Sequence, residues 1–147
     1  MDRTDMELIS HLRSHGRDSF RAVARKIGVH PTTAISRITK LEREGVITGY
    51  SANFSLPKLG YEFMALIDIT ISKGHLLDVE KRIGALPGIV AIYDITGEHD
   101  AVALVACKNR IEFSKLVKHI LSESYVERTN THVILNIMKD QSQFVPR

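Results

Sequence analysis

The sequence predicts an α+β protein: an N-terminal winged helix-turn-helix followed by a ferredoxin-like βαββαβ domain. Two observations favour this fold class. Three short segments with helical hydrophobic spacing fill the first third of the chain, and the remainder alternates twice between strand-like and helix-like runs. The segment LPKLG breaks the pattern between them. We therefore expect a DNA-binding domain over 1–54, a linker over 55–60 and a second domain over 61–147.

The first two helices are predicted from their apolar spacing and their capping residues. The first begins near Asp2 or Asp5 and ends at Ser14, and the second is capped by Asp18 or Ser19. A small residue is needed where two helices cross closely, and the second helix offers Ala24 there. The apolar stripes of the two helices are Leu8, Ile9 and Leu12, followed by Phe20, Val23, Ala24 and Ile27.

Gly28 allows a sharp turn into a third helix, which begins at Pro31 and ends before Gly45. One face of this helix is apolar and the other carries only hydroxyls and cations, which suit the edges of bases and the phosphates of a DNA duplex. An ordinary amphipathic helix with a solvated basic face would show the same pattern. The apolar face consists of Ala34, Ile35, Ile38 and Leu41. We expect Thr32, Thr33, Ser36 and Arg37 to approach bases, and Lys40, Arg43, Arg21 and Arg25 to contact phosphates.

A short strand pair, or wing, is predicted after the third helix. Two glycines, Gly45 and Gly49, bracket an apolar pair, and residues 50–54 alternate in part. Three helices and a wing make the winged form of the helix-turn-helix.

The second domain repeats one plan twice. A strand over 61–72, a helix over 76–86 and a strand over 89–96 are followed by a strand over 101–107, a helix and a final strand over 126–139. The second helix carries Phe113, Leu116, Val117 and Ile120. With both helices on one face of the sheet, the other face still holds much hydrocarbon, because the first strand and AVALVAC are apolar on both sides. We expect a second copy of the chain to cover it.

Composition limits the remaining possibilities. The chain has 147 residues, and its formal net charge of +3 arises entirely in residues 1–50, where there are nine Lys/Arg and six Asp/Glu. Such an asymmetry is typical of a nucleic-acid-binding head on a neutral body. The single cysteine, Cys107, excludes an internal disulfide and a multi-cysteine zinc site. Neither a membrane-spanning run nor a signal sequence is present, so we expect a cytoplasmic, DNA-associated protein without a membrane partner.

Four segments together resemble the Lrp/AsnC (feast/famine) transcriptional regulators over nearly the whole chain. They are MDRTDMELISHL, RDSFRAVARKIG with RITKLEREGVITGY, TGEHD, and VERTNTHVILNIMK. The resemblance implies a helix-turn-helix head and a ferredoxin-like body that dimerises and often assembles further into tetramers or octamers. It also implies a small effector, commonly an amino acid, and no other cofactor.

The resemblance places the effector at the loop formed by Gly97, Glu98, His99 and Asp100, with hydroxyl contacts from Thr129 and Thr131. The chemistry agrees, because an amino acid needs an anionic partner such as Asp100 and backbone N–H donors such as a tight turn exposes. A plain hairpin turn and two good strand formers would give the same residues. His30 departs from the family, in which serine often precedes the proline. Either Thr32 caps the helix instead or His30 contacts a phosphate.

Other classes of function are less well supported. His11 and His15 lie four residues apart on one helix, but neither has an acidic or cysteine ligand near it in sequence, so no metal site is predicted. No nucleophile or phosphate-loop motif is present, and we expect no enzyme activity. The alternative function is a ferredoxin-like small-molecule-binding module whose helix-turn-helix contacts protein.

Overall fold

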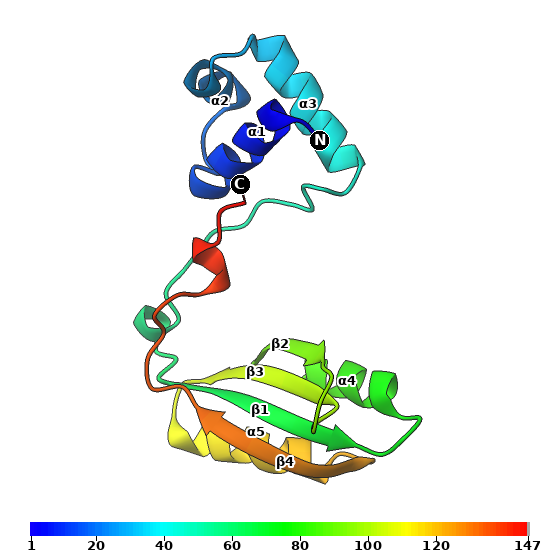
Figure 1. Cartoon of the computed structure of the whole chain (residues 1–147). Helices are drawn as coiled ribbons and strands as arrows, with labels where there is room; N and C mark the ends of the chain where they lie inside the picture. The colour runs from blue at the N-terminus through cyan, green and yellow to red at the C-terminus, as the bar shows by residue number, and fades with distance from the viewer. Residues whose placement is uncertain (147) are drawn as a thin grey trace. The chain divides into compact units, whose positions relative to one another are not determined.

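The computed structural model describes residues 1–146 and contains two compact units (Figure 1). The first comprises Met1–Asn53 and the residues from Lys139 onward, and the second comprises Phe54–Met138. Arg147, the last residue of the predicted second domain, lies outside the described residues. The C-terminal segment packs on the first helix instead of the sheet, because Ser10 Oγ donates to the Pro146 carbonyl at 2.6 Å and Arg13 Nε donates to the Phe144 carbonyl at 3.1 Å.

The first unit is the expected group of three helices: α1 (Arg3–Ser14), α2 (Phe20–Ile27) and α3 (Pro31–Arg43). Ala24 is fully buried, which agrees with its expected place at the crossing of two helices. Ile9 is only half-buried. The buried core consists of Leu8, Leu12, Val23, Ala24, Ala34 and Ile38, with Phe20, Ile27, Val29 and Ile47 packed against it.

Side chains and one glycine fix where these helices begin and end. Asp2 caps α1 and forms a reciprocal capping box with Asp5, while Ser19 Oγ caps α2 by accepting the Ala22 N–H at 3.2 Å. Gly28 ends α2 with φ +77°, a left-handed conformation that glycine adopts without strain. The turn into α3 therefore forms as the sequence predicts.

The wing is the one part of the predicted head that does not form. Among residues 1–146, the span 44–62 contains turns and a 3-10 helix (Pro57–Leu59) but no strand. The backbone N–H groups of Val46 and Ile47 both donate to the Leu41 carbonyl, so they terminate α3 and have no strand partner. The head is a helix-turn-helix without wing strands.

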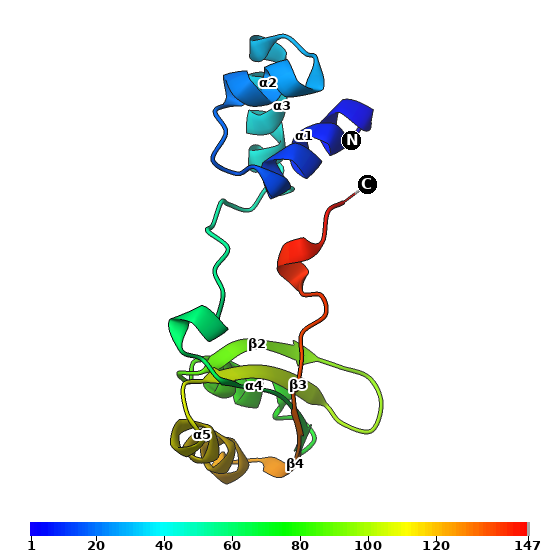
Figure 2. The ribbon, with the colours of Figure 1, turned by 90° about the vertical axis from the view of Figure 1, so that its left-hand side faces the viewer.

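The second unit has the predicted βαββαβ order. Its elements are β1 (Phe63–Ile71), α4 (Leu76–Gly84), β2 (Ile89–Asp94), β3 (Ala101–Cys107), α5 (Arg110–Ser122) and β4 (Val126–Val133). The strands pair antiparallel in the order β2-β3-β1-β4, and both helices cover one face of the sheet (Figure 2). The final strand is shorter than predicted because β1, its neighbour in the sheet, begins at Phe63.

Alternation along β1 separates the two faces of this sheet. Ile67 and Ile69 are fully buried under the helices, in a core that also contains Val79, Ile83 and Ile120. The opposite, uncovered face carries Met64, Leu66, Asp68 and Thr70 from β1 with their cross-strand partners Val102, Leu104, Arg128, Asn130 and His132. Leu66 is 40% exposed, so hydrocarbon does reach this face, but charged and polar residues share it.

Candidate functional site

The outward face of α3 is the first candidate site. Its buried side is formed by Ala34, Ile38 and Leu41, which anchor the helix on the core of the head. At about 100° per residue the residues opposite these three point to solvent. The exposed residues on that side are Thr32, Thr33, Ser36, Lys40 and Arg43.

Ile35 does not belong to the core, contrary to the prediction. Its side chain is 40% exposed. The helical spacing places it about 60° beyond Ile38, outside the arc that contacts α1 and α2. The apolar arc of α3 is therefore narrower than predicted, and the surface available to a partner is wider.

The start of α3 resolves the choice between His30 and Thr32 as the cap. His30 is the N-cap residue, and its Nδ1 accepts the Thr32 backbone N–H at 3.4 Å and lies 2.8 Å from Thr32 Oγ1. Pro31 occupies the first helical position, where no N–H is needed. The helix therefore begins where the sequence predicts, with histidine in the place of the usual short capping side chain.

Arg37 lies at the edge of the outward face, and its side chain forms ion pairs with two carboxylates of the same chain. Its Nη1 donates to Asp2 Oδ2 at 2.6 Å and to Asp5 Oδ1 at 2.9 Å. Its hydrogen bonds to these carboxylates raise the pKa of the guanidinium, and the pKa of each carboxyl is lowered, first by the backbone N–H of the capping box and then by Arg37. The structure thus joins Arg37 to α1, whereas the exposed hydroxyls expected to act with it are not part of these ion pairs.

The remaining cations are mostly available. Arg21 and Arg25 on α2, and Arg43 on α3, are exposed and form no ion pair within residues 1–146. Lys40 Nζ lies 3.9 Å from Glu44 Oε1, a loose and exposed pair. A polyanion competes easily for such side chains, because an exposed pair contributes little.

His11, on α1, and His15, the C-cap residue of that helix, stack on each other. The rings of His11 and His15 are 4.7 Å apart, and His11 Nε2 lies 2.9 Å from Asp18 Oδ2. This contact with His11 lowers the pKa of the Asp18 carboxyl. In the described part of the chain, no group of three His, Cys, Asp or Glu side chains is arranged to hold a metal ion. In the same part, none of the helices has the length and apolar character needed to cross a membrane.

The predicted effector loop, residues 97–100, is hydrogen-bonded to the C-terminal end of β1, an inner strand of the sheet. Asp100 Oδ2 accepts the Ile71 N–H at 2.7 Å, and the Asp100 N–H donates to the Ile69 carbonyl. Glu98 Oε1 accepts from Arg128 Nη2 at 3.0 Å. Gly97 has φ +127°, a conformation that favours glycine. One carboxylate oxygen of Asp100 therefore accepts a hydrogen bond from the end of β1, and the other forms no hydrogen bond within residues 1–146.

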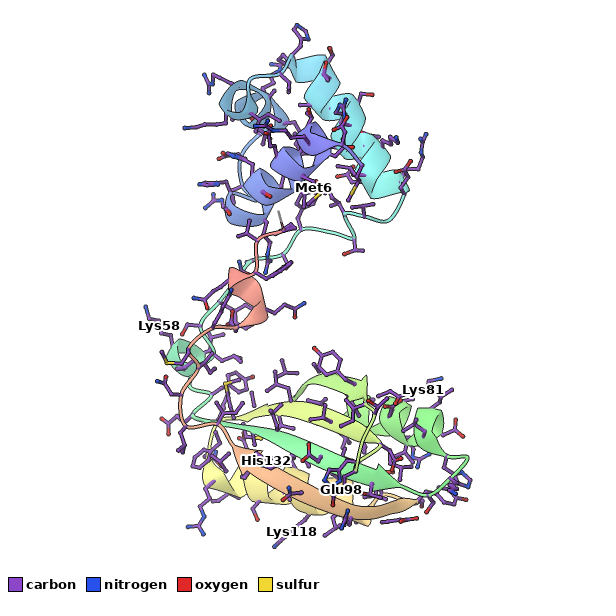
Figure 3. The ribbon with its side chains drawn as sticks, viewed as in Figure 1. Met6, Lys58, Lys81, Glu98, Lys118 and His132 are labelled. Atoms are coloured by element: carbon purple, nitrogen blue, oxygen red, sulfur yellow. The ribbon has the colours of Figure 1, made fainter. Side chains whose placement is uncertain are left out.

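His99 joins a polar cluster on the uncovered face. Its Nδ1 lies 3.1 Å from Thr70 Oγ1, and its Nε2 lies 3.8 Å from Asp68 Oδ2. His132 Nε2 approaches the same Asp68 oxygen at 2.8 Å and lies 3.0 Å from Asn130 Nδ2. Figure 3 shows His132 on β4 and Glu98 in the loop.

Thr129 and Thr131 do not lie with this cluster. They pair with Ile69 and Ile67, the buried residues of β1, and therefore share the helix-covered side of the sheet. Sequence reasoning missed Asp68 and Arg128, which do lie beside the loop. Asp68 had a usable signal, because it is the only charged residue in the strand FMALIDITI.

Comparison with known proteins agrees with both units. Two family models match: the AsnC-type helix-turn-helix domain over residues 1–42 and the Lrp/AsnC ligand binding domain over residues 64–144. An uncharacterized HTH-type transcriptional regulator of Pyrococcus furiosus is 36% identical over 146 residues, which are 99% of each chain. The HTH-type transcriptional regulator Ptr1 of Methanocaldococcus jannaschii is 29% identical over 97% of each chain.

Solved structures show the same fold. The leucine response regulatory protein LrpA of Mycobacterium tuberculosis has a TM-score of 0.84 and 27% identity, over 99% of this chain and 100% of that one. A transcriptional regulator of Neisseria meningitidis, solved in complex with L-Met, has a TM-score of 0.89 at 22% identity, over 95% and 93% of the two chains.

Proposed function

The chain belongs to the Lrp/AsnC family of transcriptional regulators, and we propose that it binds specific sites on double-stranded DNA through the outward face of α3. The observation that carries this proposal is the exposure of hydroxyls and cations on one side of a helix whose other side is anchored in the core. A helix of this kind fits the major groove, where short hydroxyls reach base edges and cations reach phosphates. The residues proposed to contact DNA are Arg21, Arg25, His30, Thr32, Thr33, Ser36, Lys40 and Arg43.

We give Arg37 a different role within this interface. Because it is bound to Asp2 and Asp5, its guanidinium fixes the direction of α3 relative to α1. Base contact by Arg37, as predicted from the sequence, would require both ion pairs to open. Among residues 1–146 the Ser36 and Thr33 hydroxyls form no side-chain hydrogen bond, so these two residues are the stronger candidates for reading bases.

The protein is further proposed to act as a homodimer or a larger assembly. Leu66 and Tyr93 are 40% and 55% exposed on the uncovered face of the sheet, next to the half-buried Val102 and Leu104. A second copy placed on this face would bury that hydrocarbon. Two heads related by a two-fold axis would then read paired half-sites about one helical turn apart.

An amino-acid effector is proposed for the loop at residues 97–100. The Asp100 oxygen that forms no hydrogen bond within residues 1–146 can receive an ammonium group. Glu98 can add to this, and Arg128 can receive a carboxylate, once their exposed ion pair opens. The Neisseria regulator of the same fold was solved with an amino acid, which supports this ligand class. Effector contacts by Thr129 and Thr131 stay a prediction from the family resemblance, although both residues lie on the opposite side of the sheet from the polar cluster of this loop.

A DNA-binding titration at several salt concentrations tests the central proposal. The native chain should bind DNA from upstream of its own gene, more weakly as salt rises. Lys40→Ala should weaken specific and random DNA equally and reduce the salt slope by about 1, whereas Ser36→Ala should lose about 1 kcal/mol on specific DNA alone. Lys58→Ala, in the linker helix, is the control. DNA binding that is insensitive to both α3 variants would refute this interface, and no DNA binding by the native chain would favour a protein partner for the head.

A further inference from the structure

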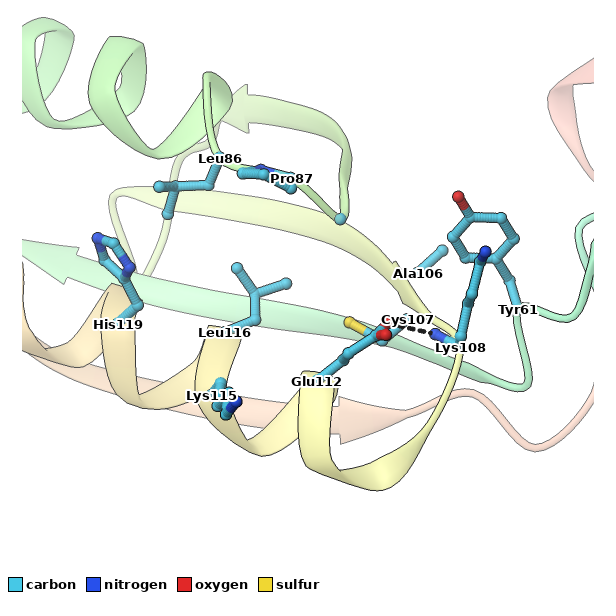
Figure 4. A pocket seen from close by; sticks show the side chains of 11 residues that line it. Tyr61, Leu86, Pro87, Ala106, Cys107, Lys108, Glu112, Lys115, Leu116 and His119 are labelled. Carbon is cyan, nitrogen blue, oxygen red and sulfur yellow. Dashed lines mark hydrogen bonds between the residues drawn. The ribbon is translucent and has the colours of Figure 1, made fainter.

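A concave site lies on the helix-covered side of the sheet, in the second unit. It is a cavity of about 420 Å³ between α5 and the turn that joins α4 to β2 (Figure 4). This volume is within the usual range for small-molecule sites. None of its residues belongs to the proposed DNA or effector sites. The apolar lining is provided by Tyr61, Leu86, Pro87, Ala106, Cys107 and Leu116.

The floor of this cavity is fixed by close backbone packing. Gly88 has φ +92°, and a Cβ there would lie 3.2 Å from the Ala106 carbonyl and 3.1 Å from Leu116 Cδ2. Its carbonyl accepts the Ala106 N–H at 2.8 Å. Only glycine satisfies both the conformation and the space. The turn is therefore held against β3 and the cavity does not depend on loose side chains.

Two lysines and one histidine stand at the rim of the cavity. Lys108, Lys115 and His119 line the cavity, and Lys108 Nζ lies 5.7 Å from the centre of the Tyr61 ring. Lys115 has no ion pair within residues 1–146. His119 Nε2 lies 3.4 Å from Glu123 Oε1, so it is the weakest of the three as an anion partner.

The one acidic residue of the lining is already engaged. Glu112 Oε2 accepts the Lys108 backbone N–H at 3.1 Å, and its Oε1 accepts from Asn109 Nδ2 at 3.3 Å. Figure 4 shows the bond from the Lys108 backbone to this carboxylate. Both oxygens accept hydrogen bonds from the two residues that precede α5. A ligand ammonium in this cavity would therefore meet Lys108 and Lys115, and the one carboxylate of the lining already accepts two hydrogen bonds.

We propose that this cavity binds a small carboxylate with an apolar, branched or aromatic body and no ammonium group, a class that includes the 2-oxo acids. The carboxylate pairs with Lys115, while the body packs on Leu86, Pro87 and Leu116. A charge-assisted hydrogen bond next to an apolar wall favours this amphiphile over inorganic phosphate, which has nothing to place on that wall. Burial, with Glu112 nearby, raises the pKa of the Cys107 thiol, so it stays a neutral part of the apolar lining at neutral pH.

Calorimetric titration of the full chain with 4-methyl-2-oxopentanoate and with leucine tests the proposal, because the two share a carbon skeleton and differ at the ammonium-bearing carbon. The oxo acid should give a saturable heat. Lys115→Gln should weaken its binding about tenfold, the effect of losing a charge-assisted bond. Lys118→Gln is the matched control: Lys118 is exposed on α5, does not line the cavity and projects away from the sheet (Figure 3).

Three outcomes would overturn the proposal. The native chain could give no heat with the oxo acid. The Lys115→Gln variant could bind it as well as the native chain or as the Lys118→Gln variant. Leucine could bind with a similar affinity and lose it equally on Lys115→Gln, which would show that an ammonium is tolerated. Leucine binding that depends on Asp100 and not on Lys115 reports the loop at residues 97–100 and agrees with two separate sites.

Discussion

Arg37 of α3 is bound to Asp5 of α1, with 2.9 Å between Nη1 and Oδ1. The Asp5 side chain is 13% exposed and that of Arg37 is 33% exposed, so the pair is partly shielded from water. Asp2 adds a second carboxylate at 2.6 Å. Two helices far apart in sequence are thus joined by one guanidinium, at the edge of the face proposed to meet DNA.

Replacing Arg37 by alanine should destabilise the head, because Asp5 then loses a charge-assisted partner in a place that is partly shielded from water. Amide hydrogen exchange in α1 and α3 measures this directly, and exchange in β1 and β3 should not change. Arg43→Ala removes an equal charge from the same helix without breaking an ion pair and is the matched control. Equal exchange in both variants would show that the Arg37 pair contributes nothing.

Acid should destabilise the head through these same carboxylates. The pKa values of Asp2 and Asp5 are lowered in the folded chain, first by the backbone N–H groups of the capping box and then by Arg37. A carboxyl whose pKa is lowered in the folded chain stabilises the fold at pH values above its ordinary pKa of 3.8. This stabilisation is lost as the pH falls from 3.8 through the folded-state pKa. Amide hydrogen exchange between about pH 3 and 6 measures this effect. We expect the loss of exchange protection in α1 below about pH 4 to be smaller in the Asp5→Asn variant than in the native chain.

The sequence predicted the order of elements well because each carries a strong local signal. Gly28 and Pro31 mark the turn of the helix-turn-helix, and the alternation around Ile67 and Ile69 marks the face of β1 that the helices cover. The wing failed for a reason that no local pattern reveals. Val46 and Ile47 read as strand residues, but their N–H groups cap α3.

The candidate sites were predicted less well, since they depend on contacts between distant segments. The exposed hydroxyls of α3 followed from helical spacing alone. Helical spacing could not predict that Arg37 pairs with Asp5 and Asp2, which lie thirty-two and thirty-five positions earlier. Nor could the sequence pattern predict that Thr129 lies on the helix-covered face of the sheet. Pairing register decides which face a strand residue occupies, and a shift of one residue reverses it.

Asp100 has a structural role that any effector experiment must separate from binding. Asp100→Ala should cost about 1–2 kcal/mol of stability, because the Ile71 N–H loses its acceptor at the end of β1. Asp100→Asn keeps an oxygen acceptor there and removes the charge. In thermal unfolding, the melting temperature of the Asp100→Asn variant should lie near that of the native chain, and that of Asp100→Ala should be lower. If the loop binds an ammonium group, both variants should lose the stabilisation given by an amino acid. A stable Asn variant with a full ligand response would exclude the carboxylate as the ammonium partner.

Replacing Glu80 on α4 by glutamine should make the folded chain more stable at neutral pH. Its Oε1 is buried without a hydrogen-bond partner in the part of the chain that the structure describes, and burial, with Asp94 nearby, raises its pKa. A raised carboxyl pKa means that folding is favoured at low pH and loses stability as the pH rises through the folded value. Glu80→Gln removes the charge, so its advantage should be roughly 1 kcal/mol at pH 7 and smaller at pH 4. Thermal unfolding at the two pH values measures it, with Glu127→Gln on the exposed side of β4 as the control. An advantage that is equal at both pH values would mean that the effect does not come from the charge of Glu80.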